Sequence, residues 1–111
     1  MTLLEYQVAA IDTAIYPNQN SFQGLVYCAL KLNGEAGEVA EHIGKSIRDD
    51  ASILTPDREE LIACELGDVL WYLANMAEEL GLTLNEIAQM NLQKLASRKA
   101  RGALGGSGDN R

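Results

Sequence analysis

Apolar residues recur every three or four positions in four stretches of the chain, and short polar breaks separate these stretches. This period is typical of amphipathic helices, and no stretch shows the strict alternation of a strand. The first stretch follows Thr2, where Thr2 and Glu5 predict a capping box. It ends before Pro17, because the residue that precedes a proline disfavours the helical conformation.

The next two stretches are longer. The second begins near residues 20–21 and runs to about Ile47. The third begins at Thr55-Pro56, which reads as a cap followed by a proline at the first helical position. It ends at Gly81, a residue suited to the position just after a helix. Its apolar residues lie on more than one side, which predicts burial against several helices.

Thr83 and Glu86 predict a second capping box, which opens the fourth helix. Residues 102–111 are rich in glycine, and this composition predicts a flexible C-terminal tail. The short connections predict an all-α fold, a compact antiparallel four-helix bundle that forms one domain over residues 1–101. The large apolar area of so short a chain favours a homo-oligomer.

Composition narrows the range of partners. The net charge of −7 argues against a basic groove for nucleic acid. No apolar run is long enough to span a membrane, and the N-terminus has no signal-peptide pattern. Cys28 and Cys64 lie in apolar helical patterns and are expected to be reduced and buried. We therefore expect a cytoplasmic protein that binds neither nucleic acid nor membrane.

The candidate chemistry lies in two acidic pairs, Glu35 with Glu38 and Glu65 with Asp68. Residues three apart share a helix face, so packing the two helices antiparallel would bring four carboxylates together. At ~4 Å and an effective dielectric constant of ~20, each pair of like charges costs about 4 kcal/mol. Only protons or a cation could hold such a cluster, and oxygen ligands point to Mg²⁺ or Mn²⁺.

The surroundings of the two pairs also match. Both segments read Glu, apolar, Gly, acid, Val, with the glycine at positions 37 and 67. A glycine inside a helix costs about 1 kcal/mol relative to alanine. Its repetition suggests a need for space, either for close helix approach or for a metal and its waters. One such pair alone would read as ordinary solvated surface.

These segments resemble a known family. The chain reads Asn33-Gly-Glu-Ala-Gly-Glu-Val-Ala-Glu41 and then Glu65-Leu-Gly-Asp-Val-Leu-Trp-Tyr72. The order ExxE then ExxD, followed by Lys94 and Arg98, resembles the MazG-like all-α nucleoside triphosphate pyrophosphohydrolases over residues 2 to about 100. The resemblance implies Mg²⁺-dependent hydrolysis of a (deoxy)nucleoside triphosphate to the monophosphate and pyrophosphate, with a role in nucleotide-pool control.

The resemblance also assigns roles. The four carboxylates would hold two or three Mg²⁺, for which Mn²⁺ could substitute, and would activate a water molecule. We expect the general base within the first pair, with Glu35 ahead of Glu38. Lys94 and Arg98 share a helix face and could hold the β and γ phosphates. The alternative for these two is to complement the helix dipole.

Other polar residues are weaker candidates for substrate contacts: Lys31, Asn91, Asn75, Asn18 and Asn20. Lys31 would reach a phosphate or neutralise Glu35. Asn91 has the family position in its favour, whereas Asn75 would contact sugar or base or form a hydrogen bond between helices. Asn18 and Asn20 lie in a loop that could close over a base. For the only histidine, His42, a structural or solvated role is favoured over a contact with the base.

Three questions stay open on the sequence. The base is not identified, although we favour a purine, dGTP or GTP. The reaction could belong to another nucleotide phosphohydrolase of the superfamily, such as one acting on phosphoribosyl-ATP, or the chain could be a non-catalytic helical dimerisation module. The oligomer could be a dimer or a dimer of dimers, and its active site could borrow residues from a neighbour.

Overall fold

The computed structural model describes residues 1–111 as four α-helices without a strand. They are α1 (Leu3–Asp12), α2 (Phe22–Asp49), α3 (Pro56–Glu79) and α4 (Leu84–Ala100). The predicted all-α class and the number of helices are therefore confirmed. None of the four helices has both the length and the apolar character that crossing a membrane would require.

The helix starts follow from local chemistry. Thr2 and Thr83 each accept a hydrogen bond from the backbone of the glutamate three residues later, and that glutamate accepts one in return. Thr55 caps α3 directly before Pro56. Gly81 follows α3 at φ +69°, in the left-handed region that favours glycine. All four of these predicted signals are confirmed, although α1 ends at Asp12, well before Pro17.

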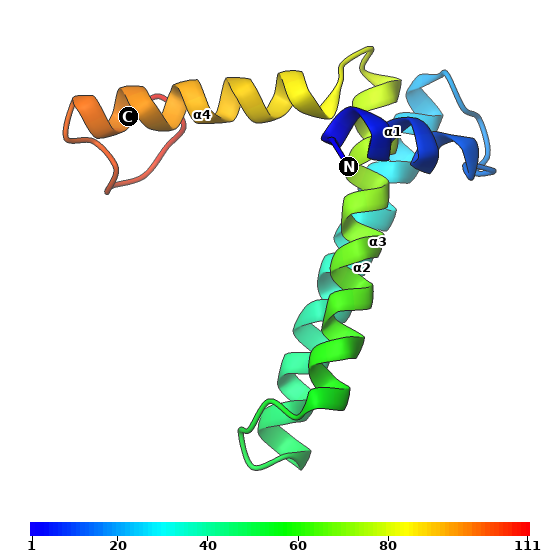
Figure 1. Ribbon diagram of the computed structural model, residues 1–111, viewed down its shortest axis with the longest axis vertical. Helices are drawn as coiled ribbons and strands as arrows, with labels where there is room; N and C mark the ends of the chain where they lie inside the picture. The colour runs from blue at the N-terminus through cyan, green and yellow to red at the C-terminus, as the bar shows by residue number, and fades with distance from the viewer.

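Helices α2 and α3 form an antiparallel hairpin, α1 packs across α3 near the open end, and α4 points away from the hairpin (Figure 1). The predicted compact bundle is not formed within one chain. The Cα radius of gyration is 16.9 Å, against about 13 Å for a compact chain of this length. The physical reason is the short turn through Gly81, which directs α4 outward instead of back along α2.

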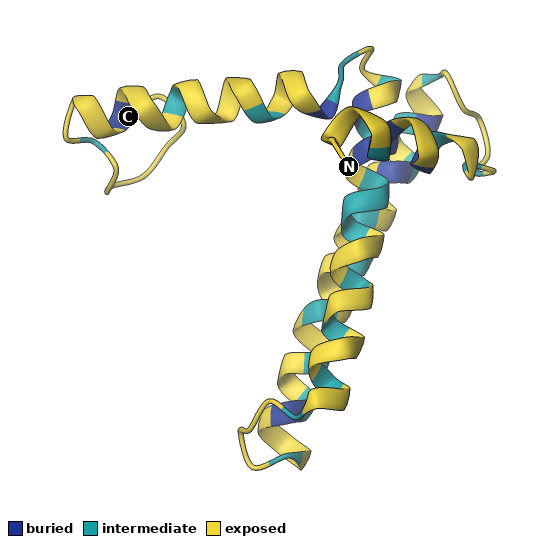
Figure 2. Ribbon diagram, in the orientation of Figure 1, coloured by how far each residue is buried: buried dark blue, intermediate teal, exposed yellow.

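Buried residues gather where α1, α3 and the start of α4 meet (Figure 2). Only 10 of the 111 residues are buried, and four of them form the apolar cluster: Ala10, Ala74, Ala77 and Leu84. The buried Gln7 fixes the turn before α4. Its Nε2 donates to the Leu82 carbonyl at 3.0 Å, and its Oε1 accepts from the Leu84 N–H at 2.7 Å.

The segment between α1 and α2 is tied to the end of α3. The Oε1 atom of Glu79 accepts hydrogen bonds from the Tyr16 hydroxyl at 2.5 Å and from the Asn20 N–H at 3.0 Å. Gly24 allows this approach, because a Cβ there would collide with the Asn18 carbonyl oxygen and lie 2.9 Å from the Glu79 carboxylate.

The two cysteines differ in their surroundings, and neither forms a disulfide. Cys28 is fully buried, as predicted, and burial raises the pKa of its thiol. Cys64 is exposed, so its predicted burial is wrong within one chain. Leu61 and Leu66, two of its apolar neighbours in sequence, are exposed as well.

Candidate metal and nucleotide site

Three carboxylates from the two arms of the hairpin come together. Glu35 lies on α2, whereas Glu65 and Asp68 lie on α3. One oxygen atom of each lies within 4.8 Å of the other two. Glu35 and Glu65 are half-buried and Asp68 is exposed, so the cluster faces solvent on one side. A set of oxygen donors alone, with excess negative charge, suits a hard divalent cation such as Mg²⁺ or Mn²⁺.

Glu38 stands apart from this cluster. Its side chain is exposed, and it is not among the three residues whose oxygens converge. Three residues along a helix correspond to a rotation about 60° short of a full turn, so Glu38 lies to one side of Glu35. The predicted convergence of four carboxylates is thus seen for Glu35, Glu65 and Asp68, with Glu38 at the margin.

The matched glycines do not mark a tight helix contact. A Cβ at Gly37 or Gly67 would meet no atom within 4 Å. Close approach of α2 and α3 therefore does not explain these glycines. The geometry agrees with the other explanation, which is open space for a metal and its waters.

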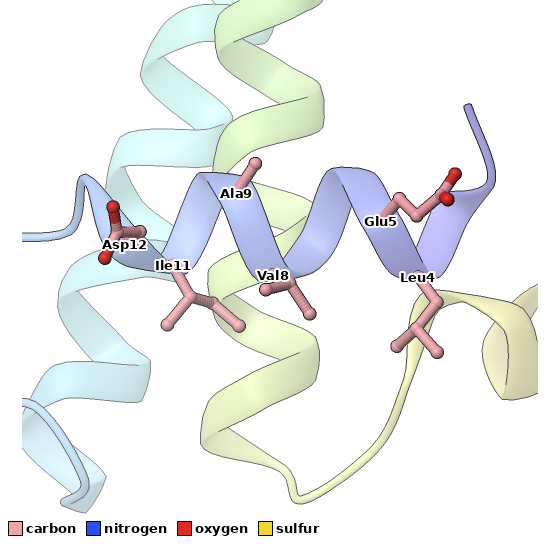
Figure 3. Close-up of a pocket in the computed structure, with 6 residues that line it drawn as sticks. All are labelled: Leu4, Glu5, Val8, Ala9, Ile11 and Asp12. Atoms are coloured by element: carbon pink, nitrogen blue, oxygen red, sulfur yellow. The ribbon is translucent and has the colours of Figure 1, made fainter.

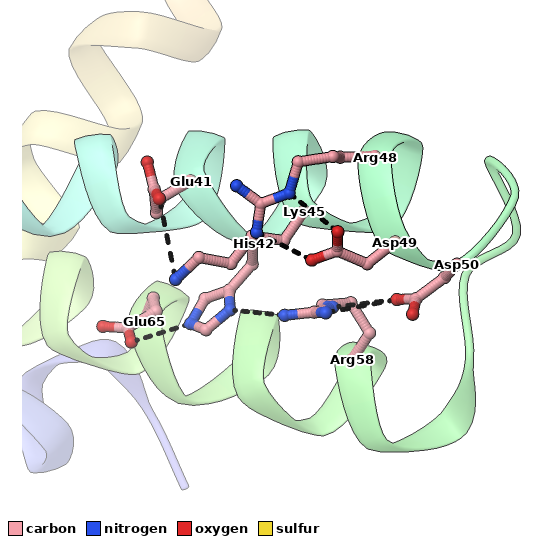
Figure 4. Close-up of polar contacts among 8 residues, drawn as sticks. All are labelled: Glu41, His42, Lys45, Arg48, Asp49, Asp50, Arg58 and Glu65. Atoms are coloured by element: carbon pink, nitrogen blue, oxygen red, sulfur yellow. Dashed lines mark hydrogen bonds and ion pairs between the residues drawn. The ribbon is translucent and has the colours of Figure 1, made fainter.

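A polar network extends from Glu65 along the hairpin toward the α2–α3 loop (Figure 4). His42 Nε2 lies 3.3 Å from Glu65 Oε1, and His42 Nδ1 lies 3.4 Å from the NH1 atom of Arg58. Arg58 in turn donates from Nε to Asp50 Oδ2 at 3.2 Å. Local sequence patterns gave no signal for Arg58 or Asp50, because the contacts join residues of different segments.

Four aromatic rings contact one another in sequence, one from the segment between α1 and α2, one from α2 and two from α3. Tyr16 stacks on Tyr27 with ring centroids 5.9 Å apart, and Trp71 meets Tyr72 edge to face at 4.9 Å. Burial raises the pKa of Tyr72, with smaller contributions from nearby groups that include Glu35. Tyr72 therefore stays a neutral phenol beside the cluster. Tyr16 and Trp71 also meet edge to face, so the rings form one continuous group.

Lys94 and Arg98 lie on α4 and are not brought to the carboxylates within one chain, since α4 points away from the hairpin (Figure 1). Both contact the C-terminal tail instead. Lys94 Nζ lies 2.8 Å from Asp109 Oδ1, and Arg98 NH2 lies 3.1 Å from the same atom. Arg98 is only 5% exposed, and its Nε has no hydrogen-bond partner.

The weaker candidates divide by exposure. Lys31 and Asn91 are exposed, and Lys31 forms no ion pair. Asn75 is 1% exposed and donates to the Trp71 carbonyl at 3.0 Å, a bond within α3 and not the hydrogen bond between helices that the sequence offered as one alternative. Asn18 and Asn20 are exposed, with positive φ angles of 60° and 61°.

The loop that carries these two asparagines is attached at Glu79, eleven residues beyond Asp68. That spacing corresponds to roughly 16 Å along α3. Neither asparagine is therefore an immediate neighbour of the carboxylate cluster.

The largest hollow of the surface is not near this chemistry. It has a volume of about 610 Å³ and lies along α1, where Leu4, Val8 and Ile11 line it with their apolar side chains (Figure 3). Its polar residues, Glu5 and Asp12, are both acidic and would repel a phosphate. An apolar stripe of this kind suits contact with another helix more than a nucleotide.

Comparisons with known proteins agree with this arrangement. Residues 23–102 match the family described as the MazG nucleotide pyrophosphohydrolase domain. The chain is 48% identical over 109 residues to the "Gene 37 protein" of Mycobacterium phage L5, with 96% of each chain covered. No solved structure matches the chain. The family match covers both acidic pairs, all of α3 and α4, and all but the first residue of α2. This chain therefore belongs to the MazG nucleotide pyrophosphohydrolase domain family.

Proposed function

We propose that this protein hydrolyses a (deoxy)nucleoside triphosphate to the monophosphate and pyrophosphate, with Mg²⁺ as cofactor, in cytoplasmic control of nucleotide pools. The observation that carries the proposal is the convergence of Glu35, Glu65 and Asp68 within a chain of the MazG family. We favour a purine nucleotide, dGTP or GTP, as the substrate.

Glu35, Glu65 and Asp68 would hold the cation, since their oxygens already lie within 4.8 Å of one another. When bound, Mg²⁺ or Mn²⁺ supplies positive charge that neutralises the triphosphate and stabilises the charge that develops during displacement at the α phosphorus. Glu38 is exposed and outside the cluster, so its carboxylate is free to accept the proton of the attacking water. Glu35 is the alternative base if fewer of its oxygens bind the cation.

Lys94 and Arg98 would bind the β and γ phosphates, because adjacent cations on one helix face suit this chemistry. In a single chain they lie away from the carboxylates (Figure 1). The role therefore requires α4 of a second copy, in a dimer or a dimer of dimers.

The exposed apolar side chains support such an assembly. Leu30, Ile47, Leu66 and Leu92 are each more than half exposed. With only 10 of 111 residues buried in the chain, another copy is the natural cover for these faces.

A product assay tests the proposal. The protein is incubated with Mg²⁺ and each of the eight common ribo- and deoxyribonucleoside triphosphates, and the products are separated by anion exchange. We expect monophosphate and pyrophosphate, with the fastest turnover for a guanine nucleotide. Diphosphate with phosphate would contradict the site of attack. Absence of turnover with all eight would leave phosphoribosyl-ATP or a non-catalytic dimerisation module.

A further inference from the structure

His42 is the only histidine of the chain, and it lies between a candidate metal ligand and a fixed cation. Its side chain is 13% exposed, and the Glu65 side chain is 20% exposed. One ring nitrogen faces Glu65 at 3.3 Å and the other faces Arg58 at 3.4 Å (Figure 4). The imidazole therefore joins α2 to α3 directly beside the carboxylate cluster.

The hydrogen-bond partners of the imidazole determine its tautomer. A guanidinium group can only donate hydrogen bonds, so the Nδ1 atom that faces Arg58 must accept. The ring proton then lies on Nε2, which donates to Glu65 Oε1. Asp50 holds Arg58 in place through an ion pair of 3.2 Å whose side chains are only 16% and 22% exposed. Asp50 and Arg58 thus select one tautomer and one orientation of His42.

We propose that His42 is a positioning residue, which holds the Glu65 carboxylate in the orientation that the divalent cation requires. The proposal rests on the metal site of the proposed function and adds Arg58 and Asp50 as the groups that orient His42. Hydrogen bonds to a ligating carboxylate fix its direction, and losing such a partner typically weakens metal affinity or activity about 10–100-fold.

A purely structural role would give a different result. If the network only joined the two helices, its loss would lower the stability of the hairpin without changing the affinity for the cation. The test therefore measures the affinity for Mn²⁺ alone, without nucleotide, by titration calorimetry and by the electron paramagnetic resonance signal of free Mn²⁺. Circular dichroism melting of each variant separates an effect on folding from an effect on the site.

The chain offers matched controls in the adjacent pair Arg48 and Asp49, an exposed ion pair at the same end of α2. We expect H42L and R58M to raise the Kd for Mn²⁺ about 10–100-fold, and D50N to raise it in the same direction. R48M removes the same charge as R58M, and D49N removes the same charge as D50N. Both controls should leave the Kd for Mn²⁺ within about twofold of the wild-type value.

His42→Gln retains a donor near the position of Nε2. We expect this variant to bind Mn²⁺ more tightly than His42→Leu does, because glutamine can still donate a hydrogen bond to Glu65 and leucine cannot. Equal Mn²⁺ affinity of the wild type, H42L and R58M would overturn the inference and leave the proposed function standing. An equal loss in R48M would also overturn it, since it would reduce the effect to net charge. A wild type that binds no Mn²⁺ would overturn both.

Discussion

The Nζ atom of Lys94 lies 2.8 Å from the Oδ1 atom of Asp109, and the same oxygen contacts Arg98 at 3.1 Å. The C-terminal tail thus places a carboxylate on the two cations that we propose for phosphate binding. A phosphate and Asp109 cannot occupy the same donors, so a triphosphate that binds there would have to displace the tail.

The first prediction concerns this competition. Asp109→Asn should lower the KM for the triphosphate several-fold and leave kcat unchanged. The reason is that a neutral amide binds Lys94 and Arg98 more weakly than a carboxylate, so the triphosphate displaces it more easily. Steady-state kinetics at fixed Mg²⁺ measure both constants. Asp57→Asn, on the exposed first turn of α3, is the control for the loss of one negative charge. A KM that does not change in the Asp109 variant would show that the tail does not compete.

The second prediction concerns pH. Hydrogen bonding and charge from Lys94, with a smaller contribution from Arg98, hold the pKa of Asp109 below its ordinary value of 3.8. Because the pKa is lowered in the folded chain, the contact is complete above 3.8 and is lost only as the pH falls through the lowered value. Carboxyl ¹³C resonances measured by NMR should place the Asp109 midpoint below 3.8, and Lys94→Met should move it upward. A midpoint at or above 3.8 in the wild type would contradict the contact.

The third prediction concerns Gly24. Alanine normally stabilises a helix relative to glycine, but at this position its Cβ would collide with the Asn18 carbonyl oxygen. We expect Gly24→Ala to lower the free energy of unfolding by about 1–3 kcal/mol. Gly44→Ala, on the same helix with no atom within 4 Å of the new Cβ, should raise it by about 0.5–1 kcal/mol. Urea denaturation compares the two, and the same sign for both would contradict the close approach.

The fourth prediction separates the two members of the first acidic pair. Glu38→Gln should lower kcat about 10²–10⁴-fold, as expected for a lost general base, with Mn²⁺ affinity unchanged. Glu35→Gln should weaken Mn²⁺ binding itself, because Glu35 belongs to the converging group. Kinetics and metal titration of both variants decide the assignment, and the reverse pattern would make Glu35 the base.

The sequence predicted the parts of the fold that local chemistry determines. Thr2, Thr55 and Thr83 start their helices as expected, since a cap and its partner lie within one turn of each other. The direction of α4 could not be predicted. It depends on the dihedral angles at Gly81 and on two hydrogen bonds of Gln7, one donated to the Leu82 carbonyl and one accepted from the Leu84 N–H, more than seventy positions away. A glutamine in a short helix reads as surface, and nothing in its neighbourhood signals that it is buried.

The same distinction applies to the candidate site. Glu35, Glu65 and Asp68 could be expected together, because helical spacing and an antiparallel hairpin bring them to one place. The contacts of His42 could not, since they depend on which residue of α3 faces it. The Lys94 contact with Asp109 was hidden as well, because a glycine-rich tail carries no pattern that indicates where it folds.

The small buried core has a consequence for how the protein responds to its own concentration. A chain with 10 of 111 residues buried has a small core from which to draw stability by itself. If a second copy covers the apolar faces, folding and association become one equilibrium governed by mass action. For a dimer, each tenfold dilution then lowers the apparent free energy of unfolding by about 1.4 kcal/mol per mole of dimer. Dilution alone would act as a denaturant, and the midpoint of thermal unfolding would rise with protein concentration.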